Sequence, residues 1–96
     1  LVICTPPGHV FIIAARSSTP LKRGLMIANG IGIVDQDYCG PNDEIKLQLF
    51  NFTDKPVEIK KGDRLAQGLF LTLDRVEWKE VKTLPKKSRG GFGSTG

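Results

Sequence analysis

The segment from Gly32 to Gly40 holds the side chains best suited to chemistry in this chain. It reads Gly-Ile-Val-Asp-Gln-Asp-Tyr-Cys-Gly, so two β-branched residues lead into the carboxylate of Asp35, and a second carboxylate, Asp37, follows two positions later. Side chains alternate between the two faces of an extended chain, which puts both carboxylates on one side. A carboxylate held at the end of a strand can act as a general base. A β-turn built from Asp and Gly is the plain structural alternative for this segment.

Three other segments carry groups that can bind phosphate. Arg16-Ser17-Ser18 follows an apolar run, and the segment from Gly62 to Gln67 reads Gly-Asp-Arg-Leu-Ala-Gln. The segment from Ser88 to Gly96 is rich in glycine and contains Arg89 and Phe92. Arginine, hydroxyl groups and backbone N–H groups all donate hydrogen bonds to phosphate oxygens, and an aromatic ring can stack on a base. Ordinary loop polarity and an unstructured tail are the alternatives.

Composition narrows the class of protein. The chain has 96 residues, of which 40% are hydrophobic and 25% charged, as expected for one small globular domain. The net charge of +4 favours an anionic partner, and a phosphorylated small molecule fits as well as a nucleic acid. The aromatic residues are hardly interleaved with the basic ones, so we expect no stable binding of nucleic acid. The longest apolar run, Val10–Ala15, is too short to span a membrane.

Two cysteines and one histidine limit the metal and redox chemistry. Cys4 and Cys39 have no metal-ligand spacing to His9, and a single pair of cysteines is too few for a disulfide scaffold. We therefore expect both cysteines to be reduced thiols in a cytoplasmic protein. A single histidine also disfavours a Ser-His-Asp triad and a histidine-rich metal site.

The apolar pattern predicts short strands separated by turns. Val10–Ala15 is predicted to be a buried strand, because it is short and rich in β-branched residues. Ile45–Leu49 alternates apolar and polar residues and continues into Phe50-Asn51-Phe52, while Leu65–Leu73 forms a further strand. Leu25–Ala28 is a short helix or strand, and no longer amphipathic helix is expected. The sequence therefore predicts an all-β sandwich or barrel that oligomerises to bury enough surface.

The ends of the chain differ in character. We expect a β-domain over residues 1–81, with Trp78 and Val81 as its last packed side chains, and a flexible C-terminal arm over residues 82–96. Leu1–Cys4 is apolar and β-prone from its first residue. We therefore expect an upstream segment of one or more strands to belong to the functional protein. An apolar groove or an unpaired strand edge would mark its place.

Taken together, these segments resemble the trimeric dUTP pyrophosphatase (dUTPase) family, which carries five short motifs in a fixed order. Arg16-Ser17-Ser18 matches the second motif, Gly32–Gly40 the third, Gly62–Gln67 the fourth and Arg89–Gly96 the fifth. The resemblance covers nearly the whole chain, and the Asp-x-Asp-Tyr and Gly-Phe-Gly-Ser-Thr-Gly cores are intact. The first motif, with its acidic residue near the metal, should lie upstream of Leu1.

The resemblance implies a fold and a reaction. The fold would be a distorted jelly roll, or β-clip, that assembles into a homotrimer with its active sites between subunits. The reaction would be hydrolysis of dUTP to dUMP and pyrophosphate, with Mg²⁺ held by the substrate phosphates and waters rather than by direct protein ligands. It would supply dUMP for thymidylate synthesis and keep uracil out of DNA. The location would be cytoplasmic, or nuclear or organellar if the source is a eukaryote.

The resemblance also implies a role for individual residues. Asp35 would orient and deprotonate the attacking water, and Tyr38 would pack beneath the deoxyribose and exclude a 2′-hydroxyl. The uracil edge would be recognised by Asn29, Ile33 and Val34. Phosphates or the water would be held by Arg16, Ser17, Ser18 and Gln67. The γ-phosphate and the base would be covered by Arg89 and Phe92, and the remaining substrate-binding residues would be Lys46, Gly91, Gly93 and Ser94.

Two alternatives remain open. A dCTP deaminase, or a bifunctional deaminase and dUTPase, has the same fold but needs a glutamate near the position of Gln48, because an amide cannot take up a proton as a carboxylate does. A non-catalytic regulatory module that binds the nucleotide is the second alternative. Asp37 is expected to hold a turn or to pair with an arginine such as Arg64, rather than to join in catalysis.

Overall fold

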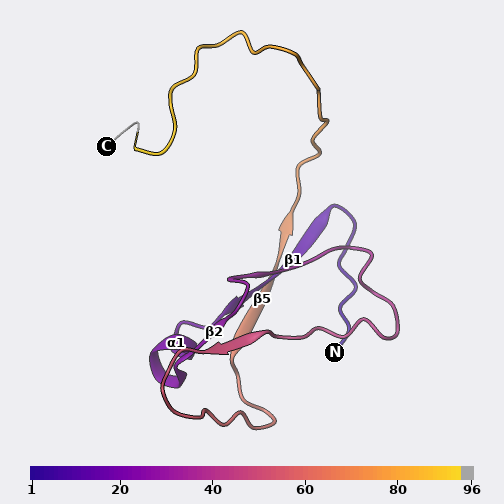
Figure 1. The fold of residues 1–96 in the computed structure, drawn as a ribbon. Coiled ribbons are helices and arrows are strands. Elements are labelled where there is room, and N and C mark those ends of the chain that lie inside the picture. The colour runs from indigo at the N-terminus through magenta and orange to yellow at the C-terminus, as the bar shows by residue number, and fades with distance from the viewer. Residues whose placement is uncertain (94–96) are drawn as a thin grey trace.

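The computed structural model describes residues 1–93, and Figure 1 shows a small β-rich body from which the C-terminal part leads away. The prediction of an all-β fold is confirmed, since the regular elements are nearly all strands. They are β1 (His9–Ala15), α1 (Ser18–Arg23), β2 (Leu25–Ile27), β3 (Gly32–Val34), β4 (Leu49–Asn51) and β5 (Ala66–Thr72).

The strands form two antiparallel sheets. In the first, β1 lies between β3 and β5, with Ile12 opposite Ile33 and Ala15 opposite Ala66. In the second, β2 pairs with β4, and Met26 lies opposite Phe50. The central position of β1 brings the segments that follow β3 and precede β5 to opposite ends of the same strand.

The core is small and is built around β1. Phe11 and Ile13 of β1 pack with Ile27 of β2, and partly buried side chains surround them: Ile3, Ala15, Val34, Ile45, Leu49 and Ala66. The ring of Phe11 also lies 5.0 Å from that of Phe70 on β5, measured between centroids. Gly68 leaves room for Phe11, because a Cβ atom at that position would collide with the ring. Only a glycine therefore lets β5 cross the aromatic side chain this closely.

Helix α1 joins the two sheets and is shorter than any helix expected to be stable alone. Thr19 is buried, and its hydroxyl donates a hydrogen bond to the Leu65 carbonyl over 2.6 Å. Gly24 ends the helix in the left-handed region with φ 65°, and its N–H donates to the Pro20 carbonyl over 3.1 Å. Tertiary contacts and a glycine cap therefore define this element. Ser18, the last residue of the Arg16-Ser17-Ser18 segment, begins the helix.

The strand predicted over Ile45–Leu49 is shorter than expected. The ladder with β2 covers only Leu49–Asn51, and Ile45–Gln48 has no strand assignment. The reason lies in the partner, because β2 ends at Ile27 and the chain turns at Asn29. The remainder of the alternating segment lines a pocket instead.

The prediction that both cysteines are reduced thiols is wrong, because Cys4 and Cys39 form a disulfide with their Cα atoms 5.0 Å apart. This separation lies in the usual range for disulfides. Antiparallel pairing explains it: Phe11 of β1 lies opposite Val34 of β3, so the segment before β1 and the segment after β3 meet at one end. Spacing in the sequence could not reveal this proximity, since the two cysteines are 35 positions apart.

The chain leaves the body after β5. From Leu73 to Gly93 there is no helix or strand, and Figure 1 shows this part curving away from the sheets. Trp78, expected to be one of the last packed side chains, is 95% exposed, so that expectation does not hold for the single chain. The boundary between residues 81 and 82 stays a prediction.

An apolar groove of about 220 Å³ lies beside the first residues, as expected. Its lining comprises Leu1, Ile3, Phe11, Ile13, Ile45, Leu47, Ala66, Gln67 and Gly68. The upstream segment that the groove was expected to hold stays a prediction. None of the helices within residues 1–93 has the length and apolar character needed to cross a membrane.

Candidate active site

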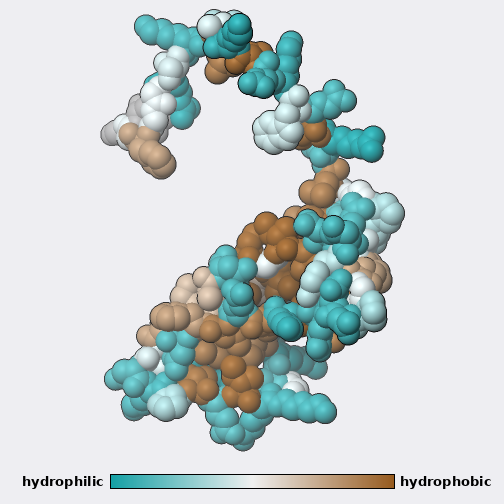
Figure 2. Space-filling model, turned by 45° about the vertical axis from the view of Figure 1, so that its right-hand side comes forward, coloured by the Kyte–Doolittle hydropathy of each residue, from teal (hydrophilic) through white to brown (hydrophobic). Residues whose placement is uncertain are grey.

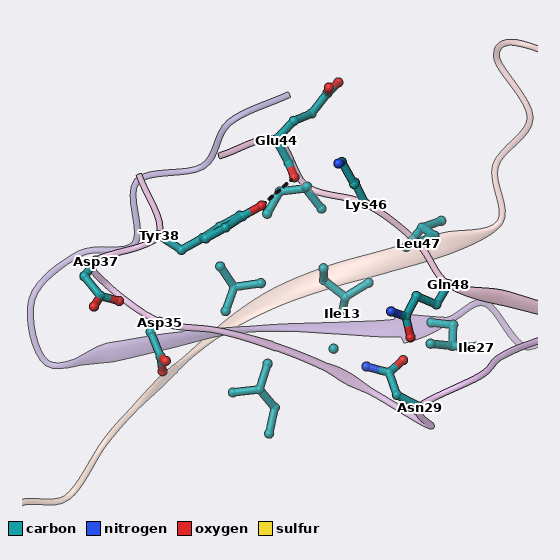
Figure 3. A pocket seen from close by; sticks show the side chains of 14 residues that line it. Ile13, Ile27, Asn29, Asp35, Asp37, Tyr38, Glu44, Lys46, Leu47 and Gln48 are labelled. Atoms are coloured by element: carbon teal, nitrogen blue, oxygen red, sulfur yellow. Dashed lines mark hydrogen bonds between the residues drawn. The ribbon is translucent and has the colours of Figure 1, made fainter. Parts of the chain in front are cut away.

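A pocket of about 340 Å³ opens between the end of β3 and the segment that precedes β4 (Figure 3). Ile13 and Ile27 of the core lie at its base, and the turn after β3 forms one wall. The full lining comprises Ile13, Ile27, Asn29, Gly32, Ile33, Val34, Asp35, Asp37, Tyr38, Glu44, Ile45, Lys46, Leu47 and Gln48. The pocket therefore combines an apolar base with polar groups at its rim, as is typical of small-molecule sites.

Asp35 and Asp37 lie at one end of this pocket, directly after β3. Their carboxylates point to the same side of the chain in Figure 3, as the alternation predicted, and both residues are exposed. The N–H of Tyr38 donates to the Asp35 carbonyl over 3.3 Å, so the chain turns here. Asp37 lies within this turn, and no ion pair joins it to Arg64 within residues 1–93; its expected role in holding the turn stays a prediction.

Tyr38 is held at both ends of its side chain. Its backbone belongs to the turn after Asp35, and its hydroxyl donates a hydrogen bond to the Glu44 carbonyl over 3.0 Å, drawn as a dashed line in Figure 3. A ring held at the Cβ and at the hydroxyl end has a defined position and a defined direction of its long axis. Such a ring can form a flat surface for a sugar or a base.

Asn29 and Gln48 form the other end of the pocket. The Ala28 N–H donates to the Gln48 carbonyl over 2.7 Å, which brings their segments together, and the side chains of Asn29 and Gln48 both line the pocket (Figure 3). A side-chain amide can donate and accept at once, so it matches the mixed edge of a pyrimidine. Of the residues expected in the site, the pocket gathers Asn29, Ile33, Val34, Asp35, Tyr38 and Lys46.

The expected phosphate-binding residues gather elsewhere. The backbone N–H of Arg16 donates to the Leu65 carbonyl and its guanidinium to the Arg64 carbonyl, both over 3.2 Å. Gln67 donates to the Ala15 carbonyl over 3.2 Å. These contacts follow from the pairing of the end of β1 with the start of β5. The second and fourth motifs therefore meet, but Arg16, Ser17, Ser18 and Gln67 do not line the pocket of the same chain.

Asp63 fixes the turn that precedes Arg64 and Gln67. Its carboxylate accepts hydrogen bonds from the Lys60 N–H over 2.9 Å and from the Arg23 guanidinium over 3.1 Å. Both bonds favour the charged form, so they hold the pKa of Asp63 below its usual value of 3.8, the backbone bond contributing most. Arg23 also donates to the Glu58 carbonyl over 2.7 Å, which ties the turn to α1.

The expected C-terminal site residues lie away from both groups. Arg89, Gly91, Phe92 and Gly93 are exposed in the segment that Figure 1 shows leading away from the body. Ser94 lies outside the described residues. The proposed contact of these residues with a substrate therefore stays a prediction.

Several pocket residues were not identified from the sequence. The alternation of Ile45 and Leu47 could have placed them on one face, since every second residue of an extended chain shares a side. The Glu44 carbonyl that holds Tyr38 gave no signal, because every residue has a carbonyl group. The other residues missed were Ile13 and Ile27.

Comparison with known proteins agrees with the geometry. The family model described as dUTPase matches residues 1–96. The deoxyuridine 5′-triphosphate nucleotidohydrolase of Dictyoglomus turgidum is 41% identical over 96 residues, covering 98% of this chain and 63% of that protein. The protein of the same name from Hydrogenobaculum sp. is 43% identical over 98 residues, covering 100% of this chain and 66% of the relative.

Solved structures give the same result. The crystal structure of dUTPase from Streptococcus mutans has a TM-score of 0.74 at 35% identity, covering 80% of this chain and 62% of that one. The dUTPase of Staphylococcus bacteriophage 80alpha with dUPNHPP has a TM-score of 0.72 at 25% identity, covering 99% and 71%. This chain thus spans 63% and 66% of the length of the two curated relatives. On sequence and on fold, the chain belongs to the dUTPase family.

Proposed function

We propose that the protein hydrolyses dUTP to dUMP and pyrophosphate, using water that is deprotonated by Asp35. The observation that carries this proposal is the pocket that unites Asp35, Tyr38 and Asn29. The names of the relatives support it, and so does the phage neighbour, which holds dUPNHPP. Phosphoryl transfer depends on positioning and charge neutralisation, so one base with suitable donors is enough.

The uracil ring of the substrate would lie between Asn29 and β3. Within residues 1–93, β3 pairs only with β1, so the backbone groups of Ile33 and Val34 that point away from β1 are open to a ligand. Together with the Asn29 amide, these groups can match the donors and acceptors of uracil. Gln48, at the same end of the pocket, adds a further amide.

The sugar would lie against the ring of Tyr38. Because the ring is fixed through the Glu44 carbonyl, it cannot swing aside to admit a larger sugar. A 2′-hydroxyl would then collide with the ring. Discrimination between dUTP and UTP would follow from this contact alone, without a specific hydrogen bond.

The active form would be a homotrimer in which another subunit supplies the phosphate-binding groups. Arg16 and Gln67 do not line the pocket of their own chain, so a site with both groups needs a second copy. Exposed apolar side chains such as Phe50 (55%) and Phe52 (50%) would be covered by such an assembly. Figure 2 shows apolar side chains gathered over one face of the body.

A magnesium ion fits this arrangement if the substrate holds it. In the part of the chain that the structure describes, no three His, Cys, Asp or Glu side chains gather into a possible metal site. Mg²⁺ usually keeps several waters and binds through substrate phosphates with one or two carboxylates at most. Bound in this way, it would neutralise charge on the triphosphate, while Asp35 handles the proton.

The C-terminal arm, residues 82–96, would cover the bound nucleotide. Arg89 carries a charge suited to the γ-phosphate, and Phe92 is exposed and can stack on the base. Substrate would order this arm, because it buries little apolar surface alone. We place the protein in the cytoplasm, where deoxynucleotides are made and consumed.

Deamination of dCTP is the less favoured alternative. Gln48 lines the pocket where that reaction needs a proton-accepting carboxylate. Incubation of the protein with dUTP, dCTP and UTP in the presence of Mg²⁺ separates the candidates. Release of pyrophosphate from dUTP, but not from dCTP or UTP, supports the proposal. Ammonia release from dCTP supports deamination, and tight binding without turnover supports a regulatory module.

A further inference from the structure

The disulfide between Cys4 and Cys39 lies next to the proposed sugar-binding side chain. Cys39 directly follows Tyr38, and Cys4 belongs to the segment that leads into β1. The bond closes a loop of 35 positions and joins the segment after β3 to the segment that precedes β1, the central strand of the sheet. The position of Tyr38 is thereby coupled covalently to β1.

The other contacts of this turn are mostly internal. The Gly40 N–H donates to the Asp43 carboxylate over 2.8 Å, and the Asp43 N–H donates to the Gly40 carbonyl over 3.1 Å. The Tyr38 hydroxyl bonds to the Glu44 carbonyl. These bonds shape the turn between residues 35 and 44 but do not fix it to the sheet. In residues 1–93, three contacts attach its ends to the N-terminal segment. They are the disulfide, the bond from the Ile45 N–H to the Leu1 carbonyl over 2.8 Å, and an exposed ion pair between the Leu1 amino group and the Glu44 carboxylate over 3.1 Å.

We propose that the Cys4–Cys39 disulfide is a thiol-sensitive positioning contact that holds the Tyr38 ring in place, so that its reduction weakens discrimination between dUTP and UTP. The inference rests on the proposed function for its readout. Cys4 is exposed and Cys39 is partly exposed, so a reductant can reach the bond. Disulfides that occur in reducing compartments are mostly transient or redox-sensing, which agrees with a regulatory role.

The redox step balances with a dithiol as reductant. A thiolate of the dithiol attacks one sulfur of the Cys4–Cys39 bond and forms a mixed disulfide, and its second thiol then releases the protein. Two electrons and two protons pass to the protein, giving two cysteine thiols, and the dithiol becomes a disulfide. Oxidation by a small disulfide reverses the step.

The experiment compares the oxidised protein with the protein treated with dithiothreitol, using thiol titration to confirm the state of each sample. Values of kcat/KM are measured for dUTP and UTP. On reduction, two thiols per chain should appear. The ratio of kcat/KM for dUTP to kcat/KM for UTP should fall by about tenfold, because small displacements of a positioning group have large effects on the rate. A loss of thermal stability with an unchanged ratio would show a purely structural bond and overturn the proposal.

Cys4→Ser and Cys39→Ser provide the matched controls. Each variant should show the low ratio of the reduced protein and should not respond to dithiothreitol. Cys4→Ser is the sharper control, because it leaves the residues around Tyr38 unchanged. A Cys4→Ser variant with the ratio of the oxidised protein would contradict the proposal, as would a disulfide that resists millimolar dithiol.

Amide hydrogen exchange separates this inference from the proposed function. The N–H groups of Tyr38, Gly40, Asp43 and Ile45 are hydrogen-bonded, so their exchange reports the order of the turn without any turnover. Faster exchange at Tyr38 and Ile45 on reduction supports the positioning role even if dUTP proves not to be the substrate. Unchanged exchange in the reduced protein would overturn that role.

Discussion

At the scale of single residues, the contact between Tyr38 and the Glu44 carbonyl explains how one ring could select the sugar. Replacing Tyr38 with Ala removes the ring, so we expect UTP to become a substrate while kcat/KM for dUTP falls. Tyr38→Phe keeps the ring and loses only the hydrogen bond of 3.0 Å, so its selectivity should fall much less. Steady-state kinetics with both nucleotides test this. Negligible UTP turnover in Tyr38→Ala would exclude the ring as the filter.

Asp63 gives a prediction for pH dependence. Its pKa is lower in the folded protein than the usual 3.8, so its charged form stabilises the fold above that value and this contribution is lost as the pH falls through the folded pKa. Asp63→Asn removes the charge, so it should be less stable than the parent at pH 7, and the difference should shrink in acid. Urea unfolding of both proteins at neutral and acidic pH measures this difference in the free energy of unfolding. A difference that stays constant or grows in acid would contradict the assignment.

At the scale of elements, Gly68 determines how closely β5 packs on β1. Gly68→Ala adds a Cβ that collides with the ring of Phe11, and overpacking of this kind costs about 1–3 kcal/mol. Gly91→Ala is the matched control, because nothing lies within 4 Å of its added Cβ and surface changes cost about 0.5 kcal/mol or less. Denaturant unfolding compares the two. Equal stability of both variants would show that Phe11 moves aside without cost.

The two long strands were predictable because their residues carry the signal themselves. The predicted Val10–Ala15 and Leu65–Leu73 differ from β1 (His9–Ala15) and β5 (Ala66–Thr72) only at the ends, since β-branched and apolar runs favour strands wherever they lie. The segment Ile45–Gln48 shows the limit of this signal. Its alternation was clear, but a strand also needs a partner, and β2 is too short to provide one.

The candidate site, like the strands, could be predicted only where the signal is local in the sequence. Asp35 and Tyr38 could be found from their motif, and the pocket brings them together with Asn29. The disulfide was missed because it depends on the pairing of β1 with β3, which no local pattern of Cys4 or Cys39 reveals. Contacts between distant backbone groups are equally invisible in a sequence.

At the scale of the whole molecule, the separation of the pocket from the Arg16 group leads to a test of assembly. Asp35→Asn and Arg16→Ala should each be nearly inactive alone. If one subunit supplies Asp35 and another supplies Arg16, refolding an equal mixture restores both groups in about a quarter of the sites, and activity should return to that extent. Light scattering checks the trimer. A mixture that assembles but stays inactive would place both groups in one chain.

The central claim is that Asp35 activates the attacking water on dUTP, and one comparison tests it most directly. Asp35→Asn preserves the shape of the side chain but cannot take up a proton, so binding of a non-hydrolysable dUTP analogue should stay within a few fold. The rate of pyrophosphate release should fall by about 10²–10⁴-fold, the usual loss for a general base. Calorimetric titration and a single-turnover assay with Mg²⁺ on the same samples measure the two quantities. Turnover at the parental rate in Asp35→Asn would contradict the account.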